Sequence, residues 1–218
     1  HTPRNLLGAM DEDRALQGAV IGGLQAPNIT AKALSDRGWT REDLVLFFET
    51  GAGPQGSAFG DMFLAVKNGL RQLTHADRTA VASYLLDADV NAPSKGEVMV
   101  AALGDSAHEN AAGQALYLSH CGLCHGPEGQ GVASTMPPLA GNATLAEPGG
   151  RNLIEVMAHG IEPESMSLTQ GYGPMPGFQD RLSAAQMADL ANYVRSVFAK
   201  GADDLPEMTA EEVKRILQ

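Results

Sequence analysis

The sequence is poor in several residue types that mark common protein classes. Its 218 residues include two cysteines and one tryptophan, and aromatic residues make up 5% of the chain. Two cysteines cannot build a disulfide framework of several pairs. No apolar run is long enough to span a bilayer as a helix, and no stretch has the layout of a signal peptide.

Basic residues are also scarce. Fifteen Lys and Arg stand against 26 Asp and Glu, which gives a formal net charge of -11. This balance argues against nucleic acid binding and would suit a basic protein partner. Hydrophobic residues nevertheless reach 44%. A small core short of aromatic rings has to be completed in some other way, and a buried cofactor would do so.

The two cysteines lie together in one motif. They occupy the ends of Cys121-Gly122-Leu123-Cys124, and His125 follows directly. C-x-x-C-H is the attachment signature of c-type haem, in which each sulfur joins one vinyl group and the histidine ligates the iron. The alternatives are weaker: a thioredoxin-like dithiol requires a βαβ pattern, and a structural zinc site requires a second ligand pair. The motif therefore predicts one covalent haem c.

The haem iron needs a sixth ligand, and Met175 is the candidate. It stands in Gly173-Pro174-Met175-Pro176-Gly177, where the two prolines stiffen the backbone and fix where the thioether points. Methionine with histidine is the axial pair that raises the potential of cytochromes c. Met136, in Thr135-Met136-Pro137-Pro138, is the main rival.

Helical patterns predict the fold class. Apolar residues recur at helical spacing in 110–119, in 152–159 and after Ser183, and the last of these helices starts with a Ser183/Gln186 capping box. Gly113 leaves room for the first and last of these helices to cross. A Thr209/Glu212 capping box predicts a short tail helix, which either lies on the protein body or docks to a partner.

The N-terminal half repeats the order of helix, loop, methionine and helix. Thr40 and Thr74 open its helices, and Met62 follows the loop at 56–60. Such internal similarity is evidence for tandem domains. We therefore expect an all-α protein of two tandem cytochrome c-like domains, the first lacking its N-terminal portion. The expected boundaries are 1–87, a linker at 88–105, a second domain at 106–200 and a tail helix at 201–218.

Further motifs resemble a known family. They are His1-Thr2-Pro3-Arg4-Asn5, Ala26-Pro27-Asn28-Ile29-Thr30, Gly60-Asp61-Met62 and Leu73-Thr74-His75-Ala76-Asp77, together with Pro137–Asn142 and Met175–Phe178 in the second half. The chain resembles the last two haem domains of the cytochrome subunits of membrane-associated alcohol, aldehyde and sugar dehydrogenases. The resemblance implies that His1 and Met62 are the axial pair of a second haem c. The sequence starts at His1, so the two cysteines that this haem requires are not part of it.

We expect the protein to transfer single electrons rather than to catalyse a reaction, because two filled axial positions leave no room for a substrate. The resemblance implies a dehydrogenase as donor, and an oxidase, a quinone site or a small cytochrome as acceptor. Covalent haem attachment implies a removed export signal and a periplasmic location, with membrane association only through a partner or the tail. The alternatives are a dihaem peroxidase, a thiosulfate-oxidising cytochrome, or a haem-based sensor.

The remaining histidines and two arginines are secondary candidates. We expect His120 and His159 to be structural residues, His75 to stand in the first turn of a helix, and His108 to lie in the linker. Arg4 and Arg151 are candidates to pair with haem propionates.

Overall fold

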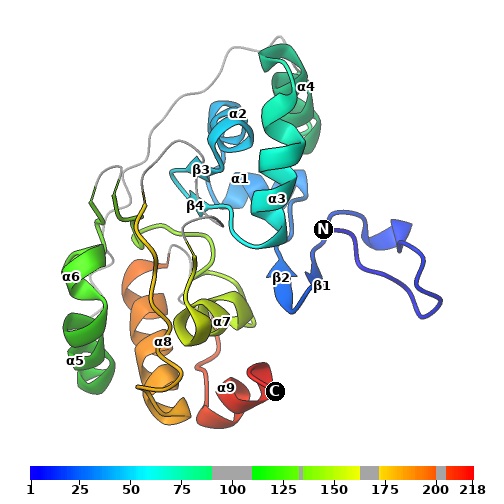
Figure 1. Cartoon of the computed structure of the whole chain (residues 1–218). Helices are drawn as coiled ribbons and strands as arrows, with labels where there is room; N and C mark the ends of the chain where they lie inside the picture. Colours follow the sequence, from blue (N-terminus) through cyan, green and yellow to red (C-terminus); the bar gives the residue numbers. More distant parts are fainter. Residues whose placement is uncertain (90–109, 133–134, 163–171, 200–204) are drawn as a thin grey trace. The chain divides into compact units, whose positions relative to one another are not determined.

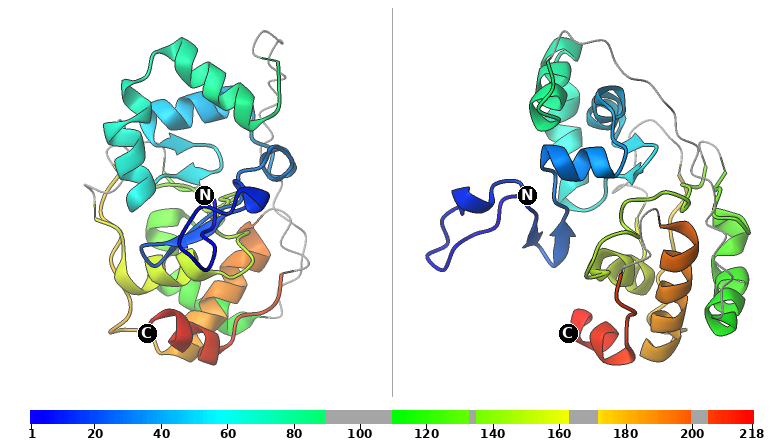
Figure 2. Two further views of the ribbon diagram at one scale, coloured as in Figure 1. Left: turned by 90° about the vertical axis from the view of Figure 1, so that its right-hand side faces the viewer. Right: turned by 180° about the vertical axis from the view of Figure 1, so that it is seen from behind.

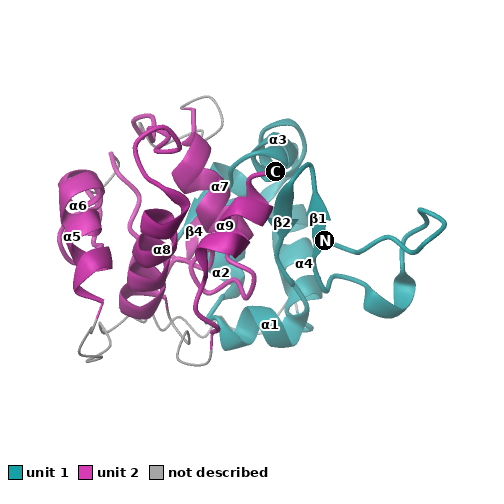
Figure 3. Ribbon diagram, turned by 90° about the horizontal axis from the view of Figure 1, so that it is seen from below, with its two compact units in different colours: residues 1–53, 58–99 teal, residues 54–57, 100–218 magenta. Residues whose placement is uncertain are grey.

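The computed structural model describes residues 1–89, 110–132, 135–162, 172–199 and 205–218. The chain divides into two compact units (Figure 3). The first unit consists of His1–Gly53 and Ala58–Met99, and the second consists of Pro54–Ser57 and Val100–Gln218. Helices dominate both units, which confirms the helix-rich class. Most of the expected linker, 90–105, lies outside the described residues. No helix in the described ranges combines the length and the hydropathy that crossing a membrane requires.

The first unit carries four α-helices in its described part, with two short strands before the first helix and one after α2 (Figure 1). The elements in chain order are η1 (Glu12–Arg14), β1 (Ala19–Ile21), β2 (Leu24–Ala26), α1 (Ala31–Asp36), α2 (Arg41–Thr50), β3 (Ala52–Gly53), α3 (Asp61–Asn68), η2 (Leu70–Gln72) and α4 (His75–Leu85). β1 pairs antiparallel with β2 through a two-residue Gly22-Gly23 turn. The sequence patterns used above did not predict this hairpin.

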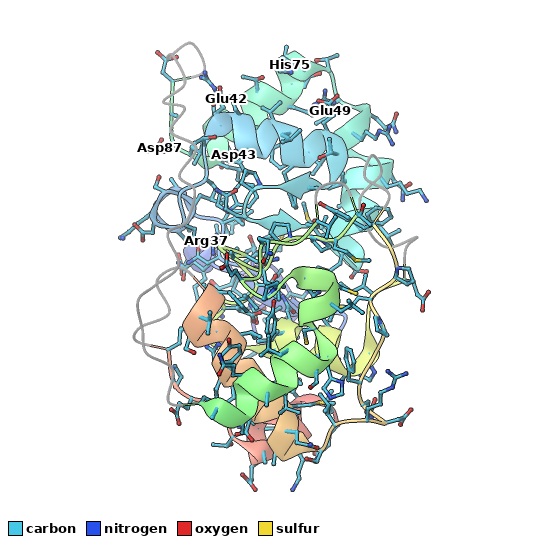
Figure 4. The ribbon with its side chains drawn as sticks, turned by 90° about the vertical axis from the view of Figure 1, so that its left-hand side faces the viewer. Arg37, Glu42, Asp43, Glu49, His75 and Asp87 are labelled. Atoms are coloured by element: carbon cyan, nitrogen blue, oxygen red, sulfur yellow. The ribbon has the colours of Figure 1, made fainter. Side chains whose placement is uncertain are left out.

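Side-chain caps and apolar faces explain the helices of the first unit. Thr40 and Thr74 each accept a hydrogen bond from the backbone three residues on, and both complete capping boxes with an aspartate. Asp43, the partner of Thr40, lies on the first turn of α2, and His75 begins α4 (Figure 4). The buried side chains between α1, α2 and α4 form one apolar cluster, made of Leu34, Leu44, Val45, Phe48 and Ala82.

The second unit holds the larger core. Its elements are β4 (Gly56–Ser57), α5 (Ala111–His120), α6 (Gly122–His125), α7 (Arg151–His159), α8 (Ala184–Phe198) and α9 (Ala210–Ile216). α5 lies alongside α8 (Figure 2). Tyr117, Tyr193 and Phe198 form an aromatic trio there, with ring centroids 5.0–6.2 Å apart. These three rings make the α5–α8 crossing an aromatic part of the core.

Gly113 is the point of closest approach in this crossing, as expected. A Cβ at Gly113 would stand 2.6 Å from Tyr193 Cβ, which is too close for two carbon atoms. The Asn110 side chain caps α5 by accepting from Gly113 N–H and also donates to the Asp189 carbonyl of α8 at 2.9 Å. The crossing is thus fixed by both steric fit and a hydrogen bond.

The tail helix α9 packs on α7 and α8 of its own unit. Val213 is fully buried there, and Ile216 and Leu217 pack against the same core. Asn192 of α8 holds the preceding segment through two hydrogen bonds with the Met208 backbone, at 2.8 and 3.0 Å. The apolar face of α9 thus lies on the body of its own unit, which is the first of the two places expected from the sequence.

Arg195 is a buried cation that ties three segments together. Its side chain is 4% exposed. The guanidinium donates to the carbonyls of Leu145, Glu147 and Pro148 in one loop, and to that of Pro206 before α9, over 3.1–3.4 Å. Because these carbonyls satisfy a buried charge, the loop and the tail are both anchored to α8.

The Glu147 carboxylate lies close to this cation but is poorly satisfied. Its Oε2 is buried and has no hydrogen-bond partner among the described residues. Burial raises the pKa of Glu147 to about 7, although a backbone hydrogen bond from Asn152 and the charges of Arg151 and Arg195 act in the opposite direction. The folded protein therefore binds this proton more tightly than the unfolded chain does.

A large side chain at the Gly113 crossing is expected to destabilise the protein. Gly113→Leu would force α5 away from α8, so we expect the free energy of unfolding to fall by about 1–3 kcal/mol. Urea unfolding followed by far-UV circular dichroism measures this. Ala115→Leu, at an exposed position of the same helix, is the matched control and is expected to cost little. Equal losses for the two variants would contradict the crossing.

Glu147 predicts a pH dependence of stability. Its pKa in the folded state is about 7, above the ordinary 4.5, so its stabilising contribution is complete at low pH and is lost as the pH rises from about 4.5 through about 7. Glu147→Gln is therefore expected to be about 1–3 kcal/mol more stable than the parent at about pH 8 and similar near pH 4. Urea midpoints at both pH values test this, with the exposed Glu128→Gln as control. A gain that does not depend on pH would exclude the titration.

Candidate haem-binding site

The C-x-x-C-H motif forms a single helical turn at the end of α5. Cys121 stands between α5 and α6, and its carbonyl accepts hydrogen bonds from Cys124 N–H at 3.1 Å and His125 N–H at 2.9 Å. The two cysteines are not joined to each other by a disulfide. This turn keeps the two sulfurs and the imidazole on one short segment, which is the arrangement that attachment to one porphyrin requires.

A proline carbonyl sets the protonation of the His125 ring. Nδ1 lies 2.9 Å from the Pro137 carbonyl oxygen. Because a carbonyl only accepts, Nδ1 carries the hydrogen and Nε2 is left with its lone pair for a metal. Burial lowers the pKa of His125, although the Pro137 hydrogen bond acts the other way. The neutral imidazole that iron ligation needs is therefore favoured.

The same environment does not fit the two alternatives for the cysteines. Burial, and secondarily the charge of Cys124, raises the pKa of Cys121 to about 11. A thioredoxin-like dithiol requires a lowered thiol pKa. In the described part of the chain, no three His, Cys, Asp or Glu side chains gather as a metal site. The residues present thus fit haem c, and they fit neither dithiol exchange nor structural zinc.

Met175 lies on an isolated strand pairing in the same unit. Its N–H and carbonyl exchange hydrogen bonds with Ile161, at 3.0 and 2.9 Å. Met175 and Cys121 both pack against the core of the second unit. Met136 has a different setting, because the next residue, Pro137, is the one that holds His125. The backbone at Met136 therefore belongs to the histidine side of the site, and Met175 remains the better candidate for the opposite side.

His1 is held in the same way as His125. Its Nδ1 lies 2.8 Å from the carbonyl of Pro27. Its own carbonyl accepts from Gly18 N–H at 2.7 Å, and the His125 carbonyl accepts from Gly131 N–H at the same distance. Both histidines thus have a ring nitrogen held by a proline carbonyl and a backbone carbonyl held by a glycine.

The two glycines have matching roles in the loops between histidine and proline. Gly18 and Gly131 have φ of 94° and 67°, values that few other residues adopt. A Cβ on Gly18 would lie 2.8 Å from the carbonyl oxygen of Ala26, and a Cβ on Gly131 would lie 2.6 Å from that of Met136. Each of these carbonyls belongs to the residue just before the proline that holds the histidine. In both loops, glycine lets one backbone segment cross close to another.

A second correspondence lies two residues before each of these glycines. Leu16 and Gly129 both have positive φ, 62° and 66°. Their carbonyls accept from Ile29 and Leu139 respectively, each at 2.8 Å. Sequence reasoning missed this repeat, since the first loop is longer and has leucine where the second has glycine. The order of histidine, glycine and proline was the available sequence signal, and the positive φ of Leu16 carries none.

Met62 shares one feature with Met175 but differs in local structure. Each methionine lies two residues after a glycine, Gly60 or Gly173. A Cβ on Gly60 would lie 2.7 Å from Leu24 Cδ1, and a Cβ on Gly173 would lie 3.4 Å from Met136 Cε. Leu24 and Met136 both belong to the chain segment that follows the histidine of their unit. Met62, however, lies in the first turn of α3. It is not a loop residue as Met175 is.

The secondary candidates have local partners. His120 packs edge-on against Phe178, and His159 lies 3.4 Å from Glu155. Arg151 also pairs with Glu155, at 3.4 Å. Arg4 donates to the Gly8 carbonyl at 2.6 Å, so it is engaged within its own hairpin. His108 lies outside the described residues.

Comparisons with known proteins indicate the family of the chain. The family model described as Cytochrome c matches residues 110–198. The chain is 29% identical to the cytochrome c subunit of alcohol dehydrogenase (quinone) from Gluconacetobacter polyoxogenes, over 99% of the chain and 48% of the relative. It is 30% identical to the fructose dehydrogenase cytochrome subunit of Gluconobacter japonicus, with the same coverage.

The chain thus spans about half the length of these two relatives. A smaller relative is covered more fully. Cytochrome c-552 of Thermus thermophilus is 32% identical over 52% of the chain and 80% of its own length. With the helical C-x-x-C-H turn and the carbonyl-bound His125, these matches establish that the chain belongs to the cytochrome c family.

Proposed function

We propose that the chain relays single electrons through two c-type haems, one in each of two tandem cytochrome c-like units. As a member of the cytochrome c family, it binds haem c covalently, through Cys121 and Cys124. The second haem is inferred from one observation: His1 and His125 each direct Nδ1 to a proline carbonyl, at 2.8 and 2.9 Å. That contact leaves Nε2 of both histidines available to a metal.

The proposed axial pairs are His125 with Met175 and His1 with Met62. Haem c, when bound, supplies the one-electron couple of its iron. Pro137 and Pro27 hold the histidine rings in one tautomer and orientation. The strand pairing with Ile161 holds the backbone of Met175, and α3 holds that of Met62.

The proposed donor is a dehydrogenase subunit. Relatives over nearly the whole chain are named as cytochrome subunits of quinone alcohol dehydrogenase and fructose dehydrogenase. The net charge of -11 suits a partner with a basic docking surface. We place the protein in the periplasm, where covalent haem would be attached, with an oxidase, a quinone site or a small cytochrome as acceptor.

The two-haem proposal predicts two haem-bearing peptides. Trypsin cleaves after Arg4, so the first haem of the natural gene product should lie on a peptide that ends in His1-Thr2-Pro3-Arg4. The second should lie on the peptide that contains Cys121 and Cys124. Peptide mass spectrometry measures both, and the second peptide is the internal control. An Arg4-terminated peptide without haem would refute the first haem.

The ligand assignment predicts that the spectrum of the Cys121/Cys124 haem depends on Met175 and not on Met136. Met175→Ala should remove the weak sulfur-to-iron band of the Cys121/Cys124 haem. It should also lower the potential of that haem by on the order of 0.1 V, within the roughly 0.8 V that axial ligands span. Visible spectra and redox titration measure these effects. Met136→Ala is the matched control and should keep the band. Loss of the band in the Met136 variant alone would transfer the assignment to Met136.

A further inference from the structure

The loop that follows His1 is much longer than the loop that follows His125. Gly131 is the sixth residue after His125, whereas its counterpart Gly18 is the seventeenth residue after His1. The second unit closes its histidine–proline contact with the shorter loop. The eleven additional residues of the first unit, which match the length of the segment Arg4–Arg14, are therefore not required to close that contact.

Hydrogen bonds within this segment hold its shape. Arg4 and Met10 pair as an antiparallel bridge, and the Arg4 guanidinium donates to the Gly8 carbonyl at 2.6 Å. The Asn5 side-chain oxygen accepts from Leu7 N–H at 3.0 Å. This turn, the apolar loop (residues 4–10), projects from the helices of its own unit (Figures 1 and 3). Its backbone is thus ordered without help from a hydrophobic core.

The apolar loop exposes three large apolar side chains. Leu6 and Leu7 are 106% and 93% exposed, and Met10 is 67% exposed. None of the three belongs to the apolar cluster of the first unit. Polar residues at these positions would keep the backbone hydrogen bonds and would interact better with water. Neighbouring exposed apolar residues on an ordered loop are typical of a surface that a partner covers.

Acidic residues follow the apolar loop directly. Asp11, Glu12 and Asp13 are consecutive. Asp11 pairs with Arg14 at 2.8 Å, whereas no ion pair within the described ranges involves Glu12 or Asp13. Both of these are exposed. An apolar centre with a charged rim is the usual build of a protein interface, and this rim is complementary to Lys or Arg on the partner.

We infer that the apolar loop docks into an apolar pocket, bordered by Lys and Arg, on the dehydrogenase subunit that reduces the chain. This inference rests on the proposed function, which supplies the donor. A second copy of the chain is a poor occupant, because each copy carries a net charge of -11 and the copies repel. An anionic lipid surface is a poor occupant too, because it would repel Glu12 and Asp13.

Site-specific photo-crosslinking identifies what covers the apolar loop. A benzophenone side chain at Leu6 of the haem-loaded natural gene product, irradiated in its own cells, should join it to the dehydrogenase subunit. The same probe at Leu46, which is 47% exposed on α2, is the control and should give little of this product. Equal yields from the two positions would overturn the inference. Crosslinks from Leu6 to the same polypeptide, to a second copy or to lipid would overturn it too.

Reduction kinetics give an independent measurement. Leu7→Ser should lower the second-order rate constant for haem reduction by the co-purified dehydrogenase by about fivefold or more, as the loss of an interface anchor does. Haem spectra and melting temperature should not change. Leu46→Ser is the control and should keep the parent rate. A parent rate in Leu7→Ser would overturn the docking role and leave the proposed donor intact. A parent protein that the dehydrogenase does not reduce would refute the donor as well.

The charged rim is tested by its salt dependence. Glu12→Gln with Asp13→Asn should slow haem reduction at about 0.01 M salt and not at about 1 M, because salt screens exposed charges. Glu207→Gln with Glu211→Gln removes the same charge from exposed positions elsewhere and should have little effect. Equal slowing by the two double variants would reduce the effect to net charge and overturn the assignment of the rim.

Discussion

The hydrogen bond from a histidine Nδ1 to a proline carbonyl is the constraint around which both units are arranged. In the second unit the partners are twelve residues apart, so the chain must leave His125 and return within a short loop. A return that tight requires backbone segments to cross at close range, which Gly131 permits at φ 67°. The first unit makes the same contact between His1 and Pro27 with a longer loop. The two units thus share the histidine–proline contact and differ in the length of the loop that closes it.

Local signals in the sequence predicted most of the helices. The capping boxes at Thr40, Thr74, Ser183 and Thr209 all start helices in the structure, because a cap and its partner lie within four residues. Gly113 was likewise predictable as a crossing point, since a glycine in a helical pattern with apolar neighbours leaves room for another helix. The Gly22-Gly23 pair was an available sequence signal for the β1–β2 hairpin, but no hairpin was predicted there.

Contacts between distant residues were not predictable in this way. Nothing near Arg195 in the sequence indicates that its guanidinium would bond to carbonyls about fifty residues earlier. The Pro27 and Pro137 carbonyls carry no side-chain signal at all, because any residue presents the same backbone oxygen. The motif identified the cysteines and His125, whereas the group that fixes the His125 ring appears only once the chain is folded.

The two units use different local structure to hold their methionines, and the reason lies in the flanking residues. Prolines on both sides of Met175 exclude it from a helix interior, so an extended pairing with Ile161 holds its backbone. Met62 has no proline beside it, and it follows Gly60, which starts α3 with a φ of 57°. In both units, a glycine two residues earlier lies close to a side chain of the segment after the histidine, Leu24 at Gly60 and Met136 at Gly173. The correspondence therefore lies in that approach, and a sequence pattern that required equal secondary structure around the two methionines would miss it.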